Sequence, residues 1–226
     1  MGRRIVFAFL AFTLVPFLAL PAARAQSTPQ QVVDEAVGVV HSFHNHNAYL
    51  DNVRALVRRA RAIIIVPNLV KAGFIFGAQG GTGVLLVHHG RGWSDPAFYN
   101  MGAASFGFQA GVSVSKVVLI VMNDRALNLA LTSAQLKLGA EAGLTIATLG
   151  AGAEGSVTSA GADIYALSSS QGLYGGVAIQ GGALGPNQDM NASYYGRPVT
   201  TEQIVYGHAR SHQRGAARLK RALSHL

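Results

Sequence analysis

The sequence predicts an α+β fold, in which a curved, mostly antiparallel, glycine-rich sheet or small barrel is flanked by N-terminal and C-terminal helices. Three observations support this class. Helical periodicity occurs near both ends and in one short central segment, apolar β-branched or alternating segments fill the middle, and glycine accounts for 27 of 226 residues. Glycine inside strands marks bulges, bends or close backbone approach, so its recurrence over several strands favours a strongly curved sheet.

The N-terminal part of the predicted domain is helical. Apolar residues return every three to four positions over residues 29–41, and again over residues 48–60. The β-branched run 62–66 predicts a buried strand, and Pro67-Asn68 predicts the turn that closes it.

Strands are predicted through the centre of the chain. The glycine-rich segment 77–83 predicts a tight hairpin turn between strands at 74–76 and 84–87. Residues 106–115 alternate, which predicts that Val112 and Val114 face the core while the serines between them face outward. The wholly apolar segment 117–122 predicts a central strand.

The C-terminal part returns to helices after a glycine-rich region. Asn123-Asp124 predicts a cap before a short helix, and strands are predicted near residues 144–146, 163–167 and 173–179. After Pro198, Thr200 predicts the start of the helical C-terminal region.

Composition excludes several classes of protein. Hydrophobic residues make up 50% of the chain and charged residues 12%, which favours a folded core over intrinsic disorder. Because the chain has no cysteine, it can hold neither a disulfide framework nor a thiolate metal site.

Residues 1–25 are predicted to be a secretory signal peptide. Arg3 and Arg4 precede an apolar run over residues 5–20, and Ala23-Arg24-Ala25 supplies a small-x-small cleavage pattern. An uncleaved anchor is the alternative, but the run is shorter than the roughly 20 apolar residues of a spanning helix. We therefore expect an exported protein, periplasmic or secreted, possessing an N-terminal helical segment at 26–62 and a main domain at 63–226.

Cofactor, metal and catalytic motifs are weak. The motif Gly150-x-Gly152-x-x-Gly155 is not followed by the predicted helix and the later acidic residue that a dinucleotide-binding site needs, so we expect no cofactor. His41, His44 and His46 have no further ligand at metal spacing, so we expect no metal site. No G-x-S-x-G or paired carboxylates indicate a hydrolase, although a dispersed catalytic set stays open as a minor hypothesis.

Basic residues beside apolar faces are the remaining signal. The early group includes Arg58, Arg59, Arg61 and Lys71, and a later group occupies residues 210–221. Such segments can bind anionic membranes, and they can also be ordinary solvated helix faces. Nucleic acid fits less well, because the net charge is modest and the chain is predicted to be exported.

Several ordered blocks make the chain resemble the SYLF domain family. The blocks are Pro67–Phe74, Gly80–Leu86, Gly92–Tyr99, Gly107–Gly111, Val117–Leu127, Lys137–Ala140, Gly172–Gly176 and Tyr194–Val199. The resemblance implies a lipid-binding module that favours phosphoinositides in eukaryotic members, some of which also bind actin and carry an SH3 domain. Export would separate this protein from actin, so we do not expect actin as its partner.

The resulting expectation is non-enzymatic binding of anionic lipids, with phosphoinositide-like headgroups, or of membrane surfaces in the cell envelope. Lys71 is taken from a block that matches the family, whereas Arg58, Arg59 and Arg61 are taken from charge placement alone. The alternative is an envelope scaffold that binds a protein partner.

Overall fold

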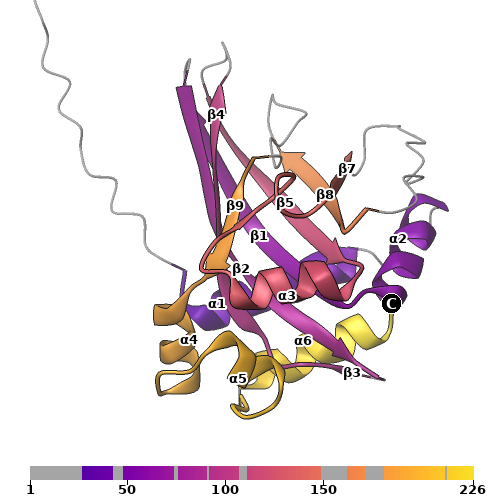
Figure 1. Cartoon of the computed structure of the whole chain (residues 1–226), viewed down its shortest axis with the longest axis vertical. Coiled ribbons are helices and arrows are strands. Elements are labelled where there is room, and N and C mark those ends of the chain that lie inside the picture. The colour runs from indigo at the N-terminus through magenta and orange to yellow at the C-terminus, as the bar shows by residue number, and fades with distance from the viewer. Residues whose placement is uncertain are drawn as a thin grey trace, which may run out of the picture.

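The computed structural model describes residues 27–42, 48–73, 76–90, 92–106, 111–148, 162–171, 181–211 and 213–226. Within these residues, nine strands form one curled sheet and six helices surround it, as Figure 1 shows. This confirms the predicted α+β class. The predicted signal peptide, residues 1–25, lies outside the described residues.

The sheet is almost entirely antiparallel. Its strands are β1 Ala62–Gly73, β2 Phe76–His89, β3 Gly92–Trp93, β4 Ala97–Phe106, β5 Gly111–Val121, β6 Leu136–Lys137, β7 Leu144–Thr148, β8 Ile164–Gln171 and β9 Ala183–Pro186. They lie in the order β6-β9-β4-β2-β1-β5-β8-β7, with β3 paired to β2. Among the described pairs, β7–β8 is the parallel one.

The helices lie near the ends of the chain and at one central position. They are α1 Pro29–Ser42, α2 Ala48–Arg59, α3 Asp124–Thr132, α4 Gln188–Tyr195, α5 Thr201–Val205 and α6 Arg214–Ser224. Asn123 caps α3 by accepting the Ala126 N–H, and Thr200 and Gln203 form a reciprocal capping box at α5. The sequence did not predict α4, because its polar residues show no apolar stripe.

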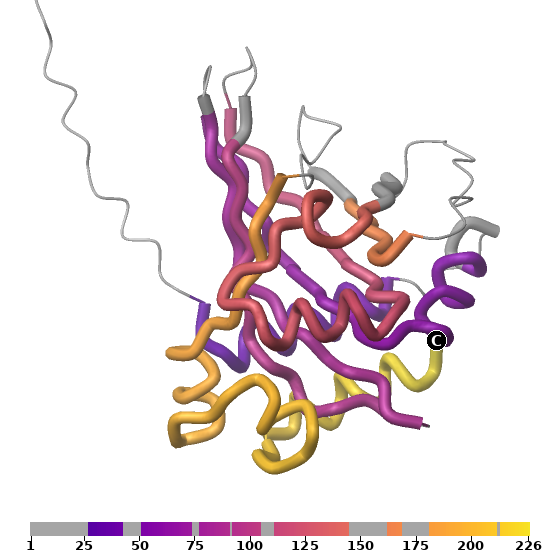
Figure 2. Tube along the Cα trace, in the orientation of Figure 1, coloured from indigo at the N-terminus to yellow at the C-terminus, as the bar shows by residue number. Residues whose placement is uncertain are grey.

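Two apolar cores lie on the two faces of the sheet. One face, with Ile63, Ile65 and Val118, packs against α1, α2, α4 and α6. The other face, with Ile64 and Leu119, packs against α3, α5 and the short strands β6 and β9. Because both faces are covered here, the segments 62–66 of β1, 84–87 of β2 and 117–121 of β5 are buried and apolar at every position, as the apolar run 117–122 predicted. The tube in Figure 2 shows how the sheet curls between these helical layers.

The predicted turn at Pro67-Asn68 is wrong. Strand β1 continues through these residues to Gly73, and the pairing register with β5 shifts between Val66 and Leu69, as at a β-bulge. The bulge turns Asn68 out to solvent without ending the strand.

The predicted hairpin turn at 77–83 is also wrong, because this segment is the interior of β2. Added Cβ atoms would overlap the Asn68 carbonyl oxygen at Gly81 and the Ile65 carbonyl oxygen at Gly83. The glycines therefore allow β1 and its bulge to lie close against β2.

The predicted faces of residues 112–115 are reversed. Val112 and Val114 are 68% and 38% exposed, whereas Ser113 and Ser115 are buried. Alternation along β5 places the serines on the same face as Leu119, inside the curl. The valines continue the face of Val118, where the strands extend beyond the helices that cover it (Figure 1).

Candidate functional site

The three predicted arginines lie at and just after the end of α2. Arg58 donates from Nη1 to the backbone oxygen of Leu226 at 2.6 Å, which joins α2 to the C-terminal end of α6. Arg61 donates from Nε to Asp124 Oδ1 at 2.7 Å, in an ion pair exposed to solvent. Arg59 is exposed, and its side chain has no hydrogen bond or ion pair to the described residues.

The structure separates Lys71 from this group. Lys71 is half-buried on β1, between Gln79 of β2 and Ser113 of β5. Ten residues of extended chain separate it from Arg61, which corresponds to about 30 Å. The structure therefore does not bring Lys71 together with the three arginines.

A second basic region lies on α6. Its apolar residues, such as Leu219 and Leu223, are buried against α1, while Arg214, Arg218 and Arg221 are exposed. Gly215 allows the close crossing, because a Cβ there would meet the side chains of Gln30 and Val33. Because the apolar residues of α6 are buried, its exposed side consists largely of basic residues.

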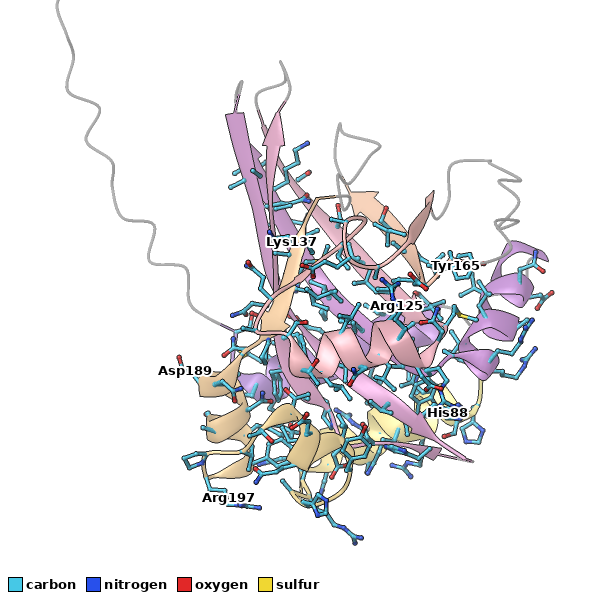
Figure 3. The ribbon with its side chains drawn as sticks, in the orientation of Figure 1. His88, Arg125, Lys137, Tyr165, Asp189 and Arg197 are labelled. Carbon is cyan, nitrogen blue, oxygen red and sulfur yellow. The ribbon has the colours of Figure 1, made fainter. Side chains whose placement is uncertain are left out.

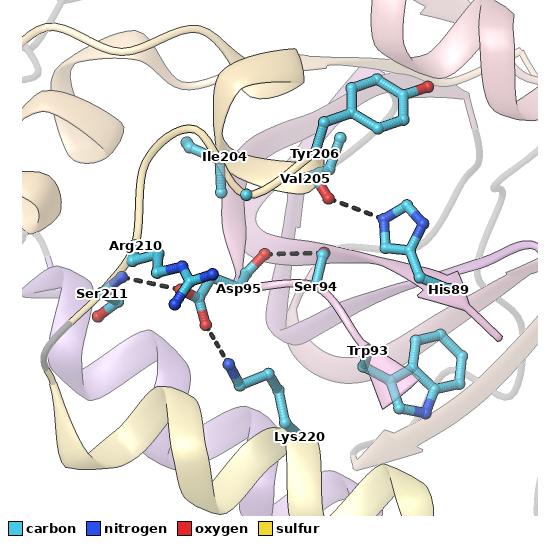
Figure 4. A pocket seen from close by; sticks show the side chains of 11 residues that line it. His89, Trp93, Ser94, Asp95, Ile204, Val205, Tyr206, Arg210, Ser211 and Lys220 are labelled. Atoms are coloured by element: carbon cyan, nitrogen blue, oxygen red, sulfur yellow. Dashed lines mark hydrogen bonds and ion pairs between the residues drawn. The ribbon is translucent and has the colours of Figure 1, made fainter. Parts of the chain in front are cut away.

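A pocket of about 450 Å³ lies between α6, the β2–β3 hairpin and the loop before α6 (Figure 4). We call it the basic pocket. Its lining residues are His89, Trp93, Ser94, Asp95, Ile204, Val205, Tyr206, Gly207, Arg210, Ser211 and Lys220.

Asp95 organises the basic pocket. Its buried carboxylate forms an ion pair with Lys220 and accepts the Ser211 N–H at 2.8 Å. It thus ties the loop and α6 to the sheet and neutralises Lys220. Among the described residues that line the pocket, Arg210 is the exposed cation without an ion pair to another described residue.

The basic pocket holds the residue types of a catalytic triad without the triad's hydrogen bonds. Ser94 Oγ accepts the Val87 N–H and donates to the Asp95 backbone oxygen, both at 2.9 Å. His89 Nε2 lies 2.7 Å from the Val205 carbonyl oxygen, to which it donates. Serine, histidine and carboxylate each bond to other partners, so the hydrogen bonds that activate a nucleophile do not join these three residues.

The half-buried Tyr195 packs beside the segment that carries Asp95. Burial raises the pKa of Tyr195 far above its usual value, and the nearby Asp95 carboxylate raises it further. Its hydroxyl donates to the Pro96 carbonyl oxygen at 2.9 Å. Tyr195 therefore stays neutral and holds the segment that carries Asp95. Phe98 and Tyr99 are fully buried, so these aromatics pack within the domain.

Other predicted motifs give no additional site in the described part of the chain. No group of three histidine or acidic residues placed to hold a metal occurs among the described residues. His44, His46 and the segment Gly150–Gly155 lie outside the described residues. Nor is any described helix both long enough and apolar enough to cross a membrane.

Two residues of the basic pocket were absent from the predicted site. Arg210 had a sequence signal, because no acidic residue follows Glu202 while five Lys or Arg residues do. Asp95 had none, because its partner Lys220 is 125 positions away.

The curled sheet, its helical cover and the basic pocket define an α+β domain with a charged surface pocket. The family described as Las17-binding protein actin regulator, Ysc84, matches residues 102–226. The chain belongs to this family, which confirms the resemblance that the sequence blocks indicated.

Individual relatives agree with this assignment. The bovine SH3 domain-containing YSC84-like protein 1 is 29% identical over 154 residues, which cover 67% of this chain and 45% of that protein. LAS seventeen-binding protein 3 from Saccharomyces cerevisiae strain S288c is 30% identical over 159 residues, which cover 69% of this chain and 34% of that protein.

The chain therefore spans less than half the length of these curated relatives. The name of the yeast relative describes binding, and the family description names a binding protein and regulator, in agreement with a non-enzymatic binding role. The expectation that actin is not a partner gains no support from these names.

Proposed function

We propose that this protein binds anionic lipid headgroups, of the phosphoinositide type, at a membrane surface. The observation that carries the proposal is the acid-free C-terminal segment 203–226, whose five Lys and Arg residues include three on the exposed side of α6. The buried side of α6 packs on α1 and is not accessible to a partner. The basic side is left for an external partner.

Two further elements extend this basic surface. The hydrogen bond from Arg58 to Leu226 brings the end of α2, with exposed Arg59, next to the end of α6. Arg210 lies at the basic pocket at the other end of the same segment. An anionic headgroup would bind Arg210, whose planar guanidinium suits phosphate oxygens.

Electrostatics set the expected strength and salt dependence. Each Lys or Arg near an anionic membrane contributes about 1 kcal/mol, so three to five of them give measurable but reversible binding. Arg218 contributes less, because it forms an ion pair with Asp34. Exposed charges are screened over about 8 Å at physiological ionic strength, so binding should weaken as salt rises.

The test is co-sedimentation of the protein with vesicles of neutral lipid, of phosphatidylserine and of phosphoinositide, at low and high salt. We expect salt-sensitive binding to both anionic vesicles and tighter binding to the phosphoinositide. Equal binding to neutral vesicles, or no binding to any, would overturn the proposal.

Variants locate the surface. We expect Arg214→Ala with Arg221→Ala to reduce binding about tenfold or more, at about 1 kcal/mol for each charge. Lys137→Ala is the matched control, because this exposed lysine lies on β6, outside the basic surface, and should leave binding unchanged. Arg59→Ala should weaken binding a few-fold, and Lys71→Ala should have no effect.

A protein partner is the second candidate, favoured by the names of the relatives, one of which is a LAS seventeen-binding protein. Export through the predicted signal peptide would place either partner in the cell envelope. Binding to membranes that ignores headgroup charge, with no loss in the α6 double variant, would favour the protein partner.

A further inference from the structure

A second cavity, of about 590 Å³, differs from the basic pocket in position and chemistry. We call it the amide pocket. It is lined by Ser27, Val32, Glu35, Asn68, Val70, Gly80, Gly81, Thr82, Asn100, Asn187, Asp189 and Met190. Figure 3 shows Asp189 at the left of the molecule, far from His88, which stacks on Trp93 of the basic pocket.

The amide pocket carries no positive charge on its described lining residues, in a chain with a net charge of +8. Three asparagines, a serine, a threonine and two carboxylates supply its polar groups. Phosphate or carboxylate ligands would be repelled by Glu35 and Asp189, so this cavity is unsuited to the anionic headgroups of the proposed function.

Hydrogen bonds fix the asparagines in the amide pocket. Asn100 Oδ1 accepts from Thr82 Oγ1 at 3.0 Å and from Asn187 Nδ2 at 2.9 Å. Asn187 Oδ1 accepts the Met190 N–H at 3.0 Å, which caps α4 and fixes that amide. Since the Asn100 oxygen takes both bonds of this network, its Nδ2 hydrogens are the donors left for a ligand.

Residues of β1 and α1 supply acceptors. The β1 bulge presents Asn68, whose Nδ2 donates to Glu35 Oε2 at 2.8 Å. This bond directs the Asn68 amide, so its Oδ1 and the second Glu35 oxygen remain acceptors. Val32, Val70 and Met190 add apolar surface between the polar groups.

We propose that the amide pocket binds an uncharged polyhydroxylated ligand, such as the sugar units of a glycan. Hydroxyl groups both donate and accept, so they can use Asn100 Nδ2 together with the oxygens of Glu35 and Asn68. Val32, Val70 and Met190 would contact the apolar C–H face of a sugar ring. The cavity volume lies within the roughly 300–1,000 Å³ of ordinary small-ligand sites.

The decisive variant is Asn100→Asp. A carboxylate there still accepts from Thr82 and Asn187, so the network and the fold are retained, but the two Nδ2 donors are lost. We expect saccharide affinity to fall about tenfold, as for loss of one or two hydrogen bonds. Asn128→Asp is the matched control, because it makes the same charge change at an exposed position on α3.

Binding is measured by calorimetry and ligand-observed NMR with the purified protein. The probes are glucose, galactose, maltose and N-acetylglucosamine disaccharide as free sugars, soluble dextran as a polymer, and CaCl2. Binding of a sugar that Asn100→Asp loses and Asn128→Asp keeps supports the proposal, and the dextran arm separates a glycan chain from a free sugar.

Three results would overturn it: no binding of any saccharide, saccharide binding unchanged in Asn100→Asp, or calcium binding that Asn100→Asp strengthens. The last would make the cavity a cation site. Vesicle binding by Asn100→Asp should equal that of the unmodified protein, so the outcome is independent of the proposed lipid function.

Discussion

The basic pocket and the amide pocket are similar in size but differ in how the chain builds them. Much of the basic pocket comes from one continuous stretch, residues 204–211, together with Lys220 and the β2–β3 hairpin. The amide pocket draws on α1, β1, β2, β4 and the start of α4. A charged site can therefore be predicted from a continuous stretch of sequence, whereas a neutral polar site depends on which residues the strand register brings together.

The two pockets also differ in what a ligand meets. In the basic pocket, Asp95 is paired with Lys220, so the anion of the proposed function would meet Arg210. In the amide pocket, hydrogen bonds orient neutral amides, so the site selects the placement of hydroxyl groups. Substitutions can disturb one pocket while the other remains as a control.

The largest effect is expected for Gly81→Ala, which should disrupt the amide pocket. A Cβ at Gly81 would overlap the Asn68 carbonyl oxygen, so β1 or β2 must shift, at a cost of about 1–3 kcal/mol. Urea denaturation should show this loss of stability. At the adjacent Gly80 the nearest atom to an added Cβ is Met101 O at 3.7 Å, so Gly80→Ala should cost much less. Equal stability of the two variants would contradict the close approach of β1 and β2.

The next effect concerns Asp95→Asn, which should change stability and binding in opposite directions. Loss of the ion pair with Lys220 should lower the free energy of unfolding by about 1.5–3 kcal/mol, the range for hydrogen bonds to charged groups. The freed Lys220 adds positive charge to the basic pocket, so phosphatidylserine vesicles should bind more tightly. Weaker vesicle binding by a folded variant would count against an anion site there.

A smaller effect is expected at Asp163, which lines neither pocket. Hydrogen bonds from Asn123 Nδ2 and the Gly143 N–H, with help from Arg125, hold the pKa of this carboxyl below its ordinary value of 3.8. Since the folded pKa is the lower one, Asp163 stabilises the fold at pH values above 3.8 and loses this contribution as pH falls below it.

The variant Asp163→Asn should therefore be about 1–2 kcal/mol less stable at pH 7, as for a lost charged hydrogen bond. The difference from the unmodified protein should shrink as the pH falls below 3.8 toward the lowered pKa of the folded state. Chemical denaturation at a series of pH values measures it. A difference that stays constant over this range would show that the ionised carboxylate is not the stabilising form.

The smallest effect on stability is expected for Arg218→Ala. Its ion pair with Asp34 is exposed, and exposed pairs contribute about 0–1 kcal/mol. Thermal unfolding should hardly change, while vesicle binding should fall by a few-fold at most. A large loss of stability would mean that α6 depends on this pair more than on its apolar contacts with α1.

The sequence by itself determined the parts of this protein that depend on near neighbours. The helices at 29–42 and 48–59, the capping box at Thr200 and the basic C-terminal segment follow from periodicity, capping chemistry and charge within a few turns of chain. The central strand followed in the same way from its continuous apolar run.

Only the tertiary structure decided the faces of β5, the use of Gly81 inside a strand, the pairing of Asp95 with Lys220 and the separation of Lys71 from the arginines. Each depends on which distant segment lies opposite, and a strand's alternation does not state which side will be covered. The amide pocket belongs to the same category, because its asparagines meet through register and a bulge. Short-range chemistry thus fixes the elements, and long-range packing fixes which of their polar groups can serve a ligand.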